Sequence, residues 1–361
     1  MTTYDLVKDF NAVTGTDCTT ALQNAFSALM QSPGNSLNVP IGGIFFCEAP
    51  LTYTLPVNQG ISIGGHGTIK FTNPTGGVSL TCSGGDYTAG LVDIDGLIIK
   101  TAVVQPGVGF SLIQTGQTSP GPVKNIDKLT ICGNGIGSYW GQGFLLDGCT
   151  GIDMSKVRVS GYYDGANYHG GGAIIQNSQA NHAVDFKMEV LNFWNIAQGL
   201  TIGDKVEGVQ VINSTFYGGT GISWMGGTSG LPSLIVGDCD FDCTGYGIYA
   251  KNIVQTQIHD NLFYVEPGGV GIYANNSVAY GPSDNGKIHH NIFKGFNTVN
   301  TNGIVLNNAD YYTVSQNGID NVTTGIWEQS GLNNRILDNV ITNFAFKDIY
   351  DQGTGTVIRR V

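Results

Sequence analysis

The chain has 361 residues, of which 54 are glycine and only 12% are charged, and its formal net charge is −11 at pH 7. Because 41% of the residues are hydrophobic, the chain can bury a core, which excludes an intrinsically disordered protein. The shortage of lysine and arginine excludes sequence-independent nucleic-acid binding and a polybasic membrane anchor.

The N-terminus, "MTTYDLVKDF", has no basic region followed by an apolar core, so no signal peptide is expected. No run approaches the ~18 apolar residues of a membrane span. The seven cysteines are odd in number and lack framework spacing. This cysteine pattern indicates buried thiols in a protein made in a reducing cytoplasm. From the lack of a long apolar run we expect no membrane partner.

The first forty residues predict a cap. In "DCTTALQNAFSALM", residues 17–30, the apolar side chains recur at helical spacing, and residues 17–20 supply capping groups. An amphipathic helix at this place would cover the exposed first coil of a repeat array. We expect residues 1–40 to form an N-terminal strand and capping helix, and residues 41–361 to form one continuous domain.

Two short phrases recur in phase through the later part of the chain. The first includes "VINSTF", "VGDCDF", "IHDNLF" and "IHHNIF" and ends at Phe216, Phe241, Phe263, Phe293, Ile319 and Ile341. The second includes "GLTI", "GISW" and "GIYA" and begins at Gly199, Gly221, Gly247, Gly271, Gly303 and Gly325. A β-sandwich would not lock two phrases together, whereas insertions confined to turns are typical of a parallel β-solenoid. The sequence therefore predicts an all-β parallel β-helix of about ten to twelve coils.

A column of asparagines runs through the first phrase. Asn261, Asn291, Asn317 and Asn339 align, which predicts one repeated tight turn, because asparagine tolerates left-handed backbone and can stack amide on amide. Asp238 lies in the preceding column, which predicts a turn residue.

The stretch "VKDFNAVTGTDCTTALQNAFSAL" resembles the opening of pectate-lyase-like right-handed parallel β-helix proteins, and "VPIGGIFF" and "ISIGGHGTIKF" resemble the strand phrases that follow it. The chain lacks the "NTD", the adjacent Asp-Asp pair and the "RIK" of polygalacturonases, and the "DPHE" of mannuronan epimerases. The chain instead resembles the phage tailspike and depolymerase group. The shared features are the lack of a signal peptide, the acidic and Gly/Asn-rich composition, the unpaired cysteines and the asparagine column. That resemblance implies a right-handed, homotrimeric β-helix in the virion tail that cleaves a bacterial surface polysaccharide (capsule, O-antigen or exopolysaccharide), and docking on another tail protein.

The stretch "GDCDFDC", residues 237–243, predicts a strand whose cysteines and phenylalanine face the core while its aspartates face outward. Glycoside hydrolysis needs two carboxyl groups. The candidate catalytic residues are Asp240 and Asp242, with Glu189 in the same column two coils earlier and Glu266 in the insertion "YVEPGG". We expect Asp240 or Glu189 as the acid and Asp242 as the base. The alternatives are a solvated strand face or a calcium site.

Candidate sugar-binding residues follow from the columns beside these acids. They are Arg158, Tyr217, Tyr264, Lys294, Trp224 and His169, the last in the loop 162–172 together with Asp164. The outward aromatics Tyr249 and Tyr273 favour a trimer interface, where tyrosine is enriched, over a sugar site.

Three histidines on neighbouring coils, His259, His289 and His290, are explained by a polar ladder rather than by a metal, and we expect no metal or cofactor. The function predicted is endo-acting, inverting hydrolysis of a bacterial polysaccharide. One alternative is a polysaccharide lyase, with Tyr217, Tyr264 or Lys294 as the base. The other is a non-catalytic receptor-binding or structural tail protein.

Overall fold

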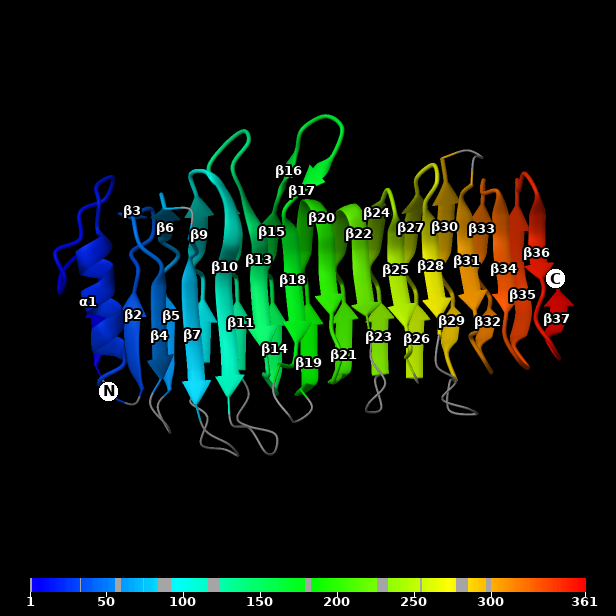
Figure 1. Ribbon diagram of the computed structural model, residues 1–361, viewed down its shortest axis with the longest axis horizontal. Coiled ribbons are helices and arrows are strands. Elements are labelled where there is room, and N and C mark those ends of the chain that lie inside the picture. The colour runs from blue at the N-terminus through cyan, green and yellow to red at the C-terminus, as the bar shows by residue number, and fades with distance from the viewer. Residues whose placement is uncertain are drawn as a thin grey trace. The chain divides into compact units, whose positions relative to one another are not determined.

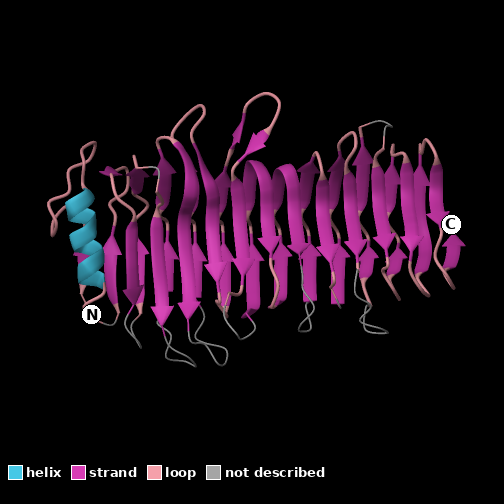
Figure 2. Ribbon diagram, viewed as in Figure 1, coloured by secondary structure: helices cyan, strands magenta, loops and turns pink. Residues whose placement is uncertain are grey.

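The computed structural model describes residues 2–32, 34–55, 60–73, 75–83, 92–115, 124–178, 183–225, 233–253, 255–276, 285–296 and 300–361. In these ranges the regular structure is β-strand apart from a single helix, α1 (Thr19–Leu29), as Figure 2 shows. The strands form a parallel β-solenoid of about 11 turns, which confirms the predicted fold class. By its contacts the chain divides into two compact units, Met1–Ala197 and Gln198–Val361, which we call unit 1 and unit 2.

In unit 1 the strands pair in parallel with strands of adjacent coils, and they form three stacks. The first stack holds β1 (Thr3–Asp5), β2 (Asn35–Asn38), β5 (Ile61–Gly64), β8 (Val92–Asp95), β11 (Lys124–Asp127), β14 (Ile152–Ser155) and β19 (Ala183–Glu189). The second holds β3 (Ile44–Cys47), β6 (Thr68–Phe71), β9 (Ile98–Thr101), β12 (Thr130–Gly133), β15 (Arg158–Ser160) and the start of β20 (Asn192–Ile202). The third holds β4 (Leu51–Leu55), β7 (Val78–Ser83), β10 (Val104–Thr115), β13 (Tyr139–Asp147) and β18 (Gly171–Gln176).

Unit 2 repeats this arrangement. Its first stack holds β21 (Val206–Ile212), β23 (Ser233–Gly237), β26 (Gln255–His259), β29 (Lys287–His289), β32 (Thr313–Ser315), the start of β35 (Arg335–Thr342) and β37 (Val357–Arg360). Its second holds the start of β22 (Thr215–Met225), β24 (Asp240–Cys243), β27 (Leu262–Val265), β30 (Ile292–Gly295), β33 (Gly318–Asp320) and the end of β35. Its third holds the end of β22, β25 (Tyr246–Lys251), β28 (Val270–Asn275), β31 (Asn302–Asn307), β34 (Thr324–Ser330) and β36 (Lys347–Asp351).

The helix α1 lies beside β2 in unit 1 (Figure 1). Its apolar face, which includes Leu22, Phe26 and Leu29, is buried, because these side chains recur every three to four residues. The N-cap residue is Cys18, which makes no side-chain capping hydrogen bond. Of the predicted capping groups, Asp17 lies one residue before it, and its Oδ1 accepts hydrogen bonds from the Thr19 backbone N–H at 2.9 Å and from the Thr19 hydroxyl at 2.6 Å. The domain boundary at residue 40 stays a prediction. Within the described residues, no helix has the length and apolarity to cross a membrane.

A column of phenylalanines forms the core of unit 2 behind the second stack. The rings of Phe216 and Phe241 lie 5.0 Å apart, those of Phe241 and Phe263 4.8 Å, and those of Phe263 and Phe293 4.7 Å, each pair within a few degrees of parallel. This stacking explains why the two sequence phrases stay in phase. A Cβ atom on Gly247 would lie 2.6 Å from the Phe263 ring, so the glycine column leaves room for the aromatic column.

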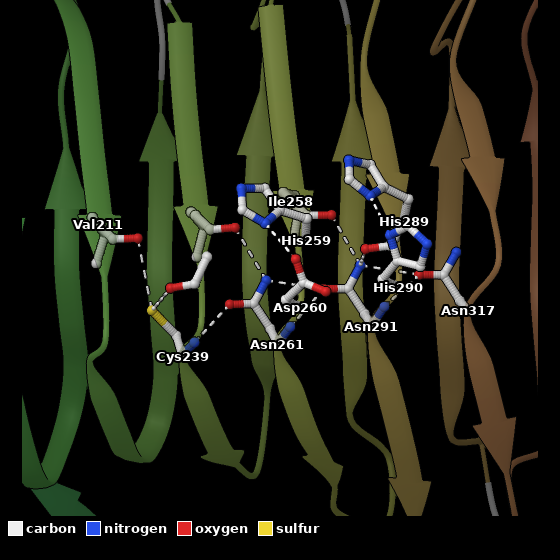
Figure 3. Close-up of polar contacts among 12 residues, drawn as sticks. Val211, Cys239, Ile258, His259, Asp260, Asn261, His289, His290, Asn291 and Asn317 are labelled. Carbon is white, nitrogen blue, oxygen red and sulfur yellow. Dashed lines mark hydrogen bonds and ion pairs between the residues drawn. The ribbon is translucent and has the colours of Figure 1, made fainter.

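The asparagine column is a hydrogen-bonded ladder (Figure 3). The buried Asn291 accepts a hydrogen bond at its Oδ1 from the Asn261 side chain at 2.9 Å, and it donates from Nδ2 to Asn317 Oδ1 at 3.0 Å. The left-handed residue of each turn is the one before the asparagine, as at Asp260 (φ 57°) and His290 (φ 57°), and Asp238 (φ 54°) has the same conformation before Cys239. The prediction of a repeated turn is therefore confirmed, but the asparagines serve as hydrogen-bonding groups rather than as the left-handed residues.

The seven cysteines are free thiols, and all but Cys132 are buried. Burial raises the pKa of the Cys239 thiol to about 12, which disfavours the reactive thiolate. The prediction of small buried thiols is confirmed for the six buried cysteines.

The close contact between the glycine column and the phenylalanine column predicts that a larger residue in place of a glycine lowers the stability of the fold. Gly247→Ala would force the new methyl group against the Phe263 ring and the Gly271 carbonyl oxygen, 2.6 Å away, so we expect a loss of about 1–3 kcal/mol in the free energy of unfolding. Denaturant unfolding measures this loss. Gly318→Ala is the control, because its Cβ would meet no heavy atom within 4 Å. Equal losses in the two variants would contradict the role of the glycine column.

Candidate active site

Two aspartates project outward from β24 in unit 2. Asp240 and Asp242 flank the buried Phe241, as the alternation of a strand requires. Their Cα atoms are about 6.5–7 Å apart, the spacing of alternate residues along a strand. Both side chains are partly buried, so the face predicted from "GDCDFDC" is present but is not freely solvated.

The neighbouring strands supply the walls around these acids. In register, Asp240 lies between Thr215 of β22 and Leu262 of β27, whereas Asp242 lies between Tyr217 and Tyr264. These side chains displace water from the carboxylates. One oxygen of Asp240, Oδ1, is buried and has no hydrogen-bond partner among the described residues.

Burial determines the electrostatics of the pair. Desolvation raises the pKa of Asp240 above its ordinary value. Desolvation also raises the pKa of Asp242, and the negative charges of Glu266 and Asp240 raise it further. None of the three carboxylates forms an ion pair with another described residue. We call Asp240, Asp242 and Glu266 the carboxylate cluster.

Glu266 reaches the cluster from the turn between β27 and β28, where Gly269 donates a backbone hydrogen bond to the Glu266 carbonyl at 2.8 Å. Lys294 continues the outward column after Tyr264, and its Nζ lies 6.0 Å from the centroid of the Tyr264 ring. The structure therefore brings six of the predicted residues to one region of unit 2: Asp240, Asp242, Glu266, Tyr217, Tyr264 and Lys294.

Trp224 is not a sugar-binding residue, contrary to the prediction. Its side chain is fully buried, because it belongs to the inward column of the third stack. The next two residues of that column are Ala250 and Ala274, whose small side chains leave room for the indole.

Glu189 was placed in the wrong column by the sequence alignment. It ends β19 in the first stack of unit 1 and pairs with Ser155. The residue that pairs with the exposed Arg158 is Asn192, three positions later. The expected place of Glu189 in the column of Asp240 rested on the incorrect register.

His169 lies in unit 1 on a hairpin of β16 (Tyr162–Tyr163) and β17 (Tyr168–His169), which projects past the neighbouring strands in Figure 2. Its Nε2 is 2.7 Å from Asp164 Oδ2, and the hydrogen bond to His169 holds the pKa of Asp164 well below its usual range. The ring stacks on Tyr139 with centroids 5.4 Å apart. This pairing confirms neither a catalytic nor a sugar-binding role.

Sequence reasoning missed Tyr246. It lies edge-on to both Tyr249 and Tyr273, at 5.2 and 5.7 Å, and these two rings stack at 5.4 Å. The signal was the phrase "GYGIYA", in which the residue before the glycine is aromatic. Whether Tyr249 and Tyr273 form a trimer interface stays a prediction.

The three histidines form a polar ladder, as expected. The rings of His259 and His289 stack at 5.4 Å, and His259 Nδ1 is 2.9 Å from Asp260 Oδ2 (Figure 3). Burial lowers the pKa of His289, and the neighbouring His259 and His290 lower it further. In the part of the chain that the structure describes, no group of three or more His, Cys, Asp or Glu is arranged to hold a metal ion.

Solved structures with the same architecture include phage tailspike proteins. Tailspike protein 3 of bacteriophage CBA120 superposes with a TM-score of 0.58 at 16% identity, over 98% of this chain and 56% of that one. A mutant tailspike protein of E. coli bacteriophage HK620 superposes with a TM-score of 0.51 at 10% identity, over 94% of this chain and 78% of that one. The chain has the tailspike-like parallel β-helix fold.

This tailspike-like chain spans 56% of the CBA120 protein that it matches, and identities this low establish the fold alone. The HK620 tailspike has also been solved in complex with a pentasaccharide; that structure has a TM-score of 0.46 at 12% identity, over 94% of this chain and 78% of that one. No protein-family model and no curated protein sequence matches the chain.

The raised pKa values predict an unusual effect on stability. A carboxyl group whose pKa is raised by folding stabilises the fold while it is protonated, and this contribution is lost as the pH rises through the folded-state pKa. Ionised Asp242 therefore costs stability at neutral pH. We expect Asp242→Asn to raise the melting temperature at about pH 7, and the gain to shrink as the pH approaches about 4, near the ordinary aspartate pKa.

The matched control is Asp320→Asn, in the same outward column. Hydrogen bonds from Thr342 and Asn343, both at 2.7 Å, lower the pKa of Asp320, so its ionised form stabilises the fold and the substitution should lower the melting temperature at neutral pH. A loss of stability in Asp242→Asn at pH 7 would contradict the desolvation of the cluster.

Proposed function

We propose that this chain is a tailspike-like depolymerase that binds a bacterial surface polysaccharide and cleaves it by hydrolysis at the carboxylate cluster. The observation that carries the proposal is the pair Asp240 and Asp242: two outward, partly buried carboxyl groups on one strand, both with raised pKa values. An exposed strand face would hydrate its aspartates fully. Perturbed carboxyl groups beside aromatic rings are typical of functional sites.

The spacing of the pair favours inversion. Inverting glycosidases hold their two carboxyl groups about 6.5–9.5 Å apart so that a water molecule fits between the sugar and the base, whereas retaining enzymes hold them about 5–5.5 Å apart. The Cα spacing of alternate strand residues, about 6.5–7 Å, lies nearer the inverting range.

The charges near Asp240 and Asp242 indicate which of the two is the acid and which is the base. Burial and the negative charges of Glu266 and Asp240 all raise the pKa of Asp242, whereas burial alone raises the pKa of Asp240. We therefore assign Asp242 as the acid that protonates the glycosidic oxygen, and Asp240 as the base that takes a proton from the attacking water. This assignment reverses the roles expected for Asp242 from the sequence. Because the two groups interact, their apparent pKa values belong to the pair.

The walls of the cluster would hold the sugar. Tyr217 and Tyr264 flank Asp242 in register, and the C–H face of a pyranose packs well on an aromatic ring. Lys294, next in the column, can donate hydrogen bonds to hydroxyl or carboxylate groups. Arg158 and His169 remain candidate sugar ligands of unit 1. Action in the virion tail, a homotrimeric state and docking on another tail protein remain proposals that follow from the fold.

Cleavage tests the proposal directly. Purified capsule, O-antigen and exopolysaccharide preparations are incubated with the wild type and with the variants Asp240→Asn and Asp242→Asn, and their size is followed by size-exclusion chromatography. We expect the wild type to shorten one polysaccharide and each variant to be slower by about 10²–10⁴-fold. Asp320→Asn, which removes an outward carboxylate of the same column, should cut at the wild-type rate.

The alternatives give different results. Ultraviolet absorbance from an unsaturated product would identify a lyase and would contradict hydrolysis. Binding without shortening would identify a receptor-binding protein. Wild-type cleavage rates in both cluster variants would exclude the cluster as the active site.

A further inference from the structure

A cavity lined by polar and aromatic side chains lies in unit 2, at the third stack. It has a volume of about 340 Å³ and is lined by the aromatic residues Trp327, Phe346 and Tyr350 and by polar residues that include Asn300, Asn302 and Thr324. We call it the aromatic pocket. Neither the fold nor the proposed mechanism requires it, and pockets of this size hold small ligands.

The three aromatic rings of the pocket pack against one another. Trp327 and Tyr350 pair in register on β34 and β36, and their rings stack with centroids 5.9 Å apart and planes 25° from parallel. Phe346 stands edge-on to Tyr350 at 5.6 Å, and 56% of its surface is exposed. The Trp327 indole N–H donates to Gln352 Oε1 at 3.1 Å, which fixes the orientation of the ring.

The polar side of the pocket carries unused hydrogen-bonding groups. The side-chain amides of Asn300 and Asn302 make no hydrogen bond to another described residue, although both line the cavity. Each amide offers a donor and an acceptor, and a sugar hydroxyl also offers both. Aromatic rings and free amides that line one cavity match a pyranose, which has an apolar C–H face and polar hydroxyl groups.

The aromatic pocket and the carboxylate cluster lie in the same unit, and a column of paired residues connects them. Tyr249 follows Asp242 in the same coil, and it leads through the in-register column Tyr273 and Val305 to Trp327. Three steps of about 4.8 Å separate Tyr249 from Trp327, or about 14 Å along the stack. This distance is the axial part of the separation between the cluster, on the second stack, and the pocket, on the third stack.

We propose that the aromatic pocket is a pyranose-binding subsite that anchors the polysaccharide a few sugar units from the carboxylate cluster. The choice of ligand rests on the proposed function, but the pocket itself is argued from its own residues. Lys347, whose Nζ lies 6.0 Å from the Phe346 ring, adds a positive charge at the rim. A uronic acid should therefore bind more tightly than the matching neutral sugar.

The test measures monosaccharide binding by saturation-transfer NMR, with glucose, galactose, N-acetylglucosamine and glucuronic acid as probes. We expect the wild type to bind at least one probe, with glucuronic acid favoured over glucose. Asn300→Ala/Asn302→Ala and Phe346→Ala should each weaken binding about tenfold or more, a change of about 1.4 kcal/mol. The side chains of these residues carry no described hydrogen bond, and their backbone hydrogen bonds do not depend on the side chain, so the variants should fold, with a small cost at Asn300, whose φ is 61°. Trp194→Ala in unit 1, another exposed aromatic, is the control and should leave binding unchanged.

The Asp240→Asn/Asp242→Asn variant separates the two proposals. Monosaccharide binding that persists in this variant, and is lost in the pocket variants, supports the subsite whether or not the wild type cleaves a polysaccharide. Absence of binding by the wild type, or equal binding by the pocket variants, overturns the subsite and leaves the cleavage result standing alone. Loss of self-association in the pocket variants with unchanged sugar binding would identify a subunit interface and would also overturn it.

Discussion

Parallel stacking of coils at a spacing of about 4.8 Å is the constraint on which the rest of the structure depends. Strand residues inside each stack have in-register neighbours on the adjacent coils, so a side chain fits only where its neighbours in the column leave room for it. In unit 2 this requirement produces the stacked phenylalanines, the glycines that make room for them and the asparagine ladder. The same requirement places outward side chains in columns, where tyrosines and aspartates become close neighbours without any long-range loop.

The stacking of side chains in columns lowers the stability of the fold at the carboxylate cluster. Asp240 and Asp242 lie between tyrosine, threonine and leucine side chains of the adjacent coils, which remove water from the carboxylates without offering an ion pair. A fold optimised for stability alone would place amides or hydroxyls there. Retention of unpaired charge in a desolvated site is the usual trade-off between stability and function.

Much of the fold could be predicted from the sequence, because repeated phrases report the register directly. The alignment of Phe216, Phe241, Phe263 and Phe293 matches the strand pairing of unit 2. The alignment failed at Glu189, where Leu191 stands in place of the asparagine that marks the turn and the apolar residues of β19 and β20 admit two registers. It also failed at Trp224, since the buried position of an indole depends on the alanines in the next coils, a packing fact that one phrase does not contain. Tyr350 was missed because its phrase, "KDIYD", lacks the glycine that marks the other coils.

The central claim is that Asp240 and Asp242 form a desolvated acid–base pair rather than a solvated strand face. The most direct measurement is the titration of individual aspartate carboxyl groups by NMR, with Asp320 as the internal reference. We expect Asp240 and Asp242 both to titrate above about 3.9, the ordinary aspartate value, and Asp320 to titrate below it. Titration of Asp240 and Asp242 at or below the ordinary value would contradict the account.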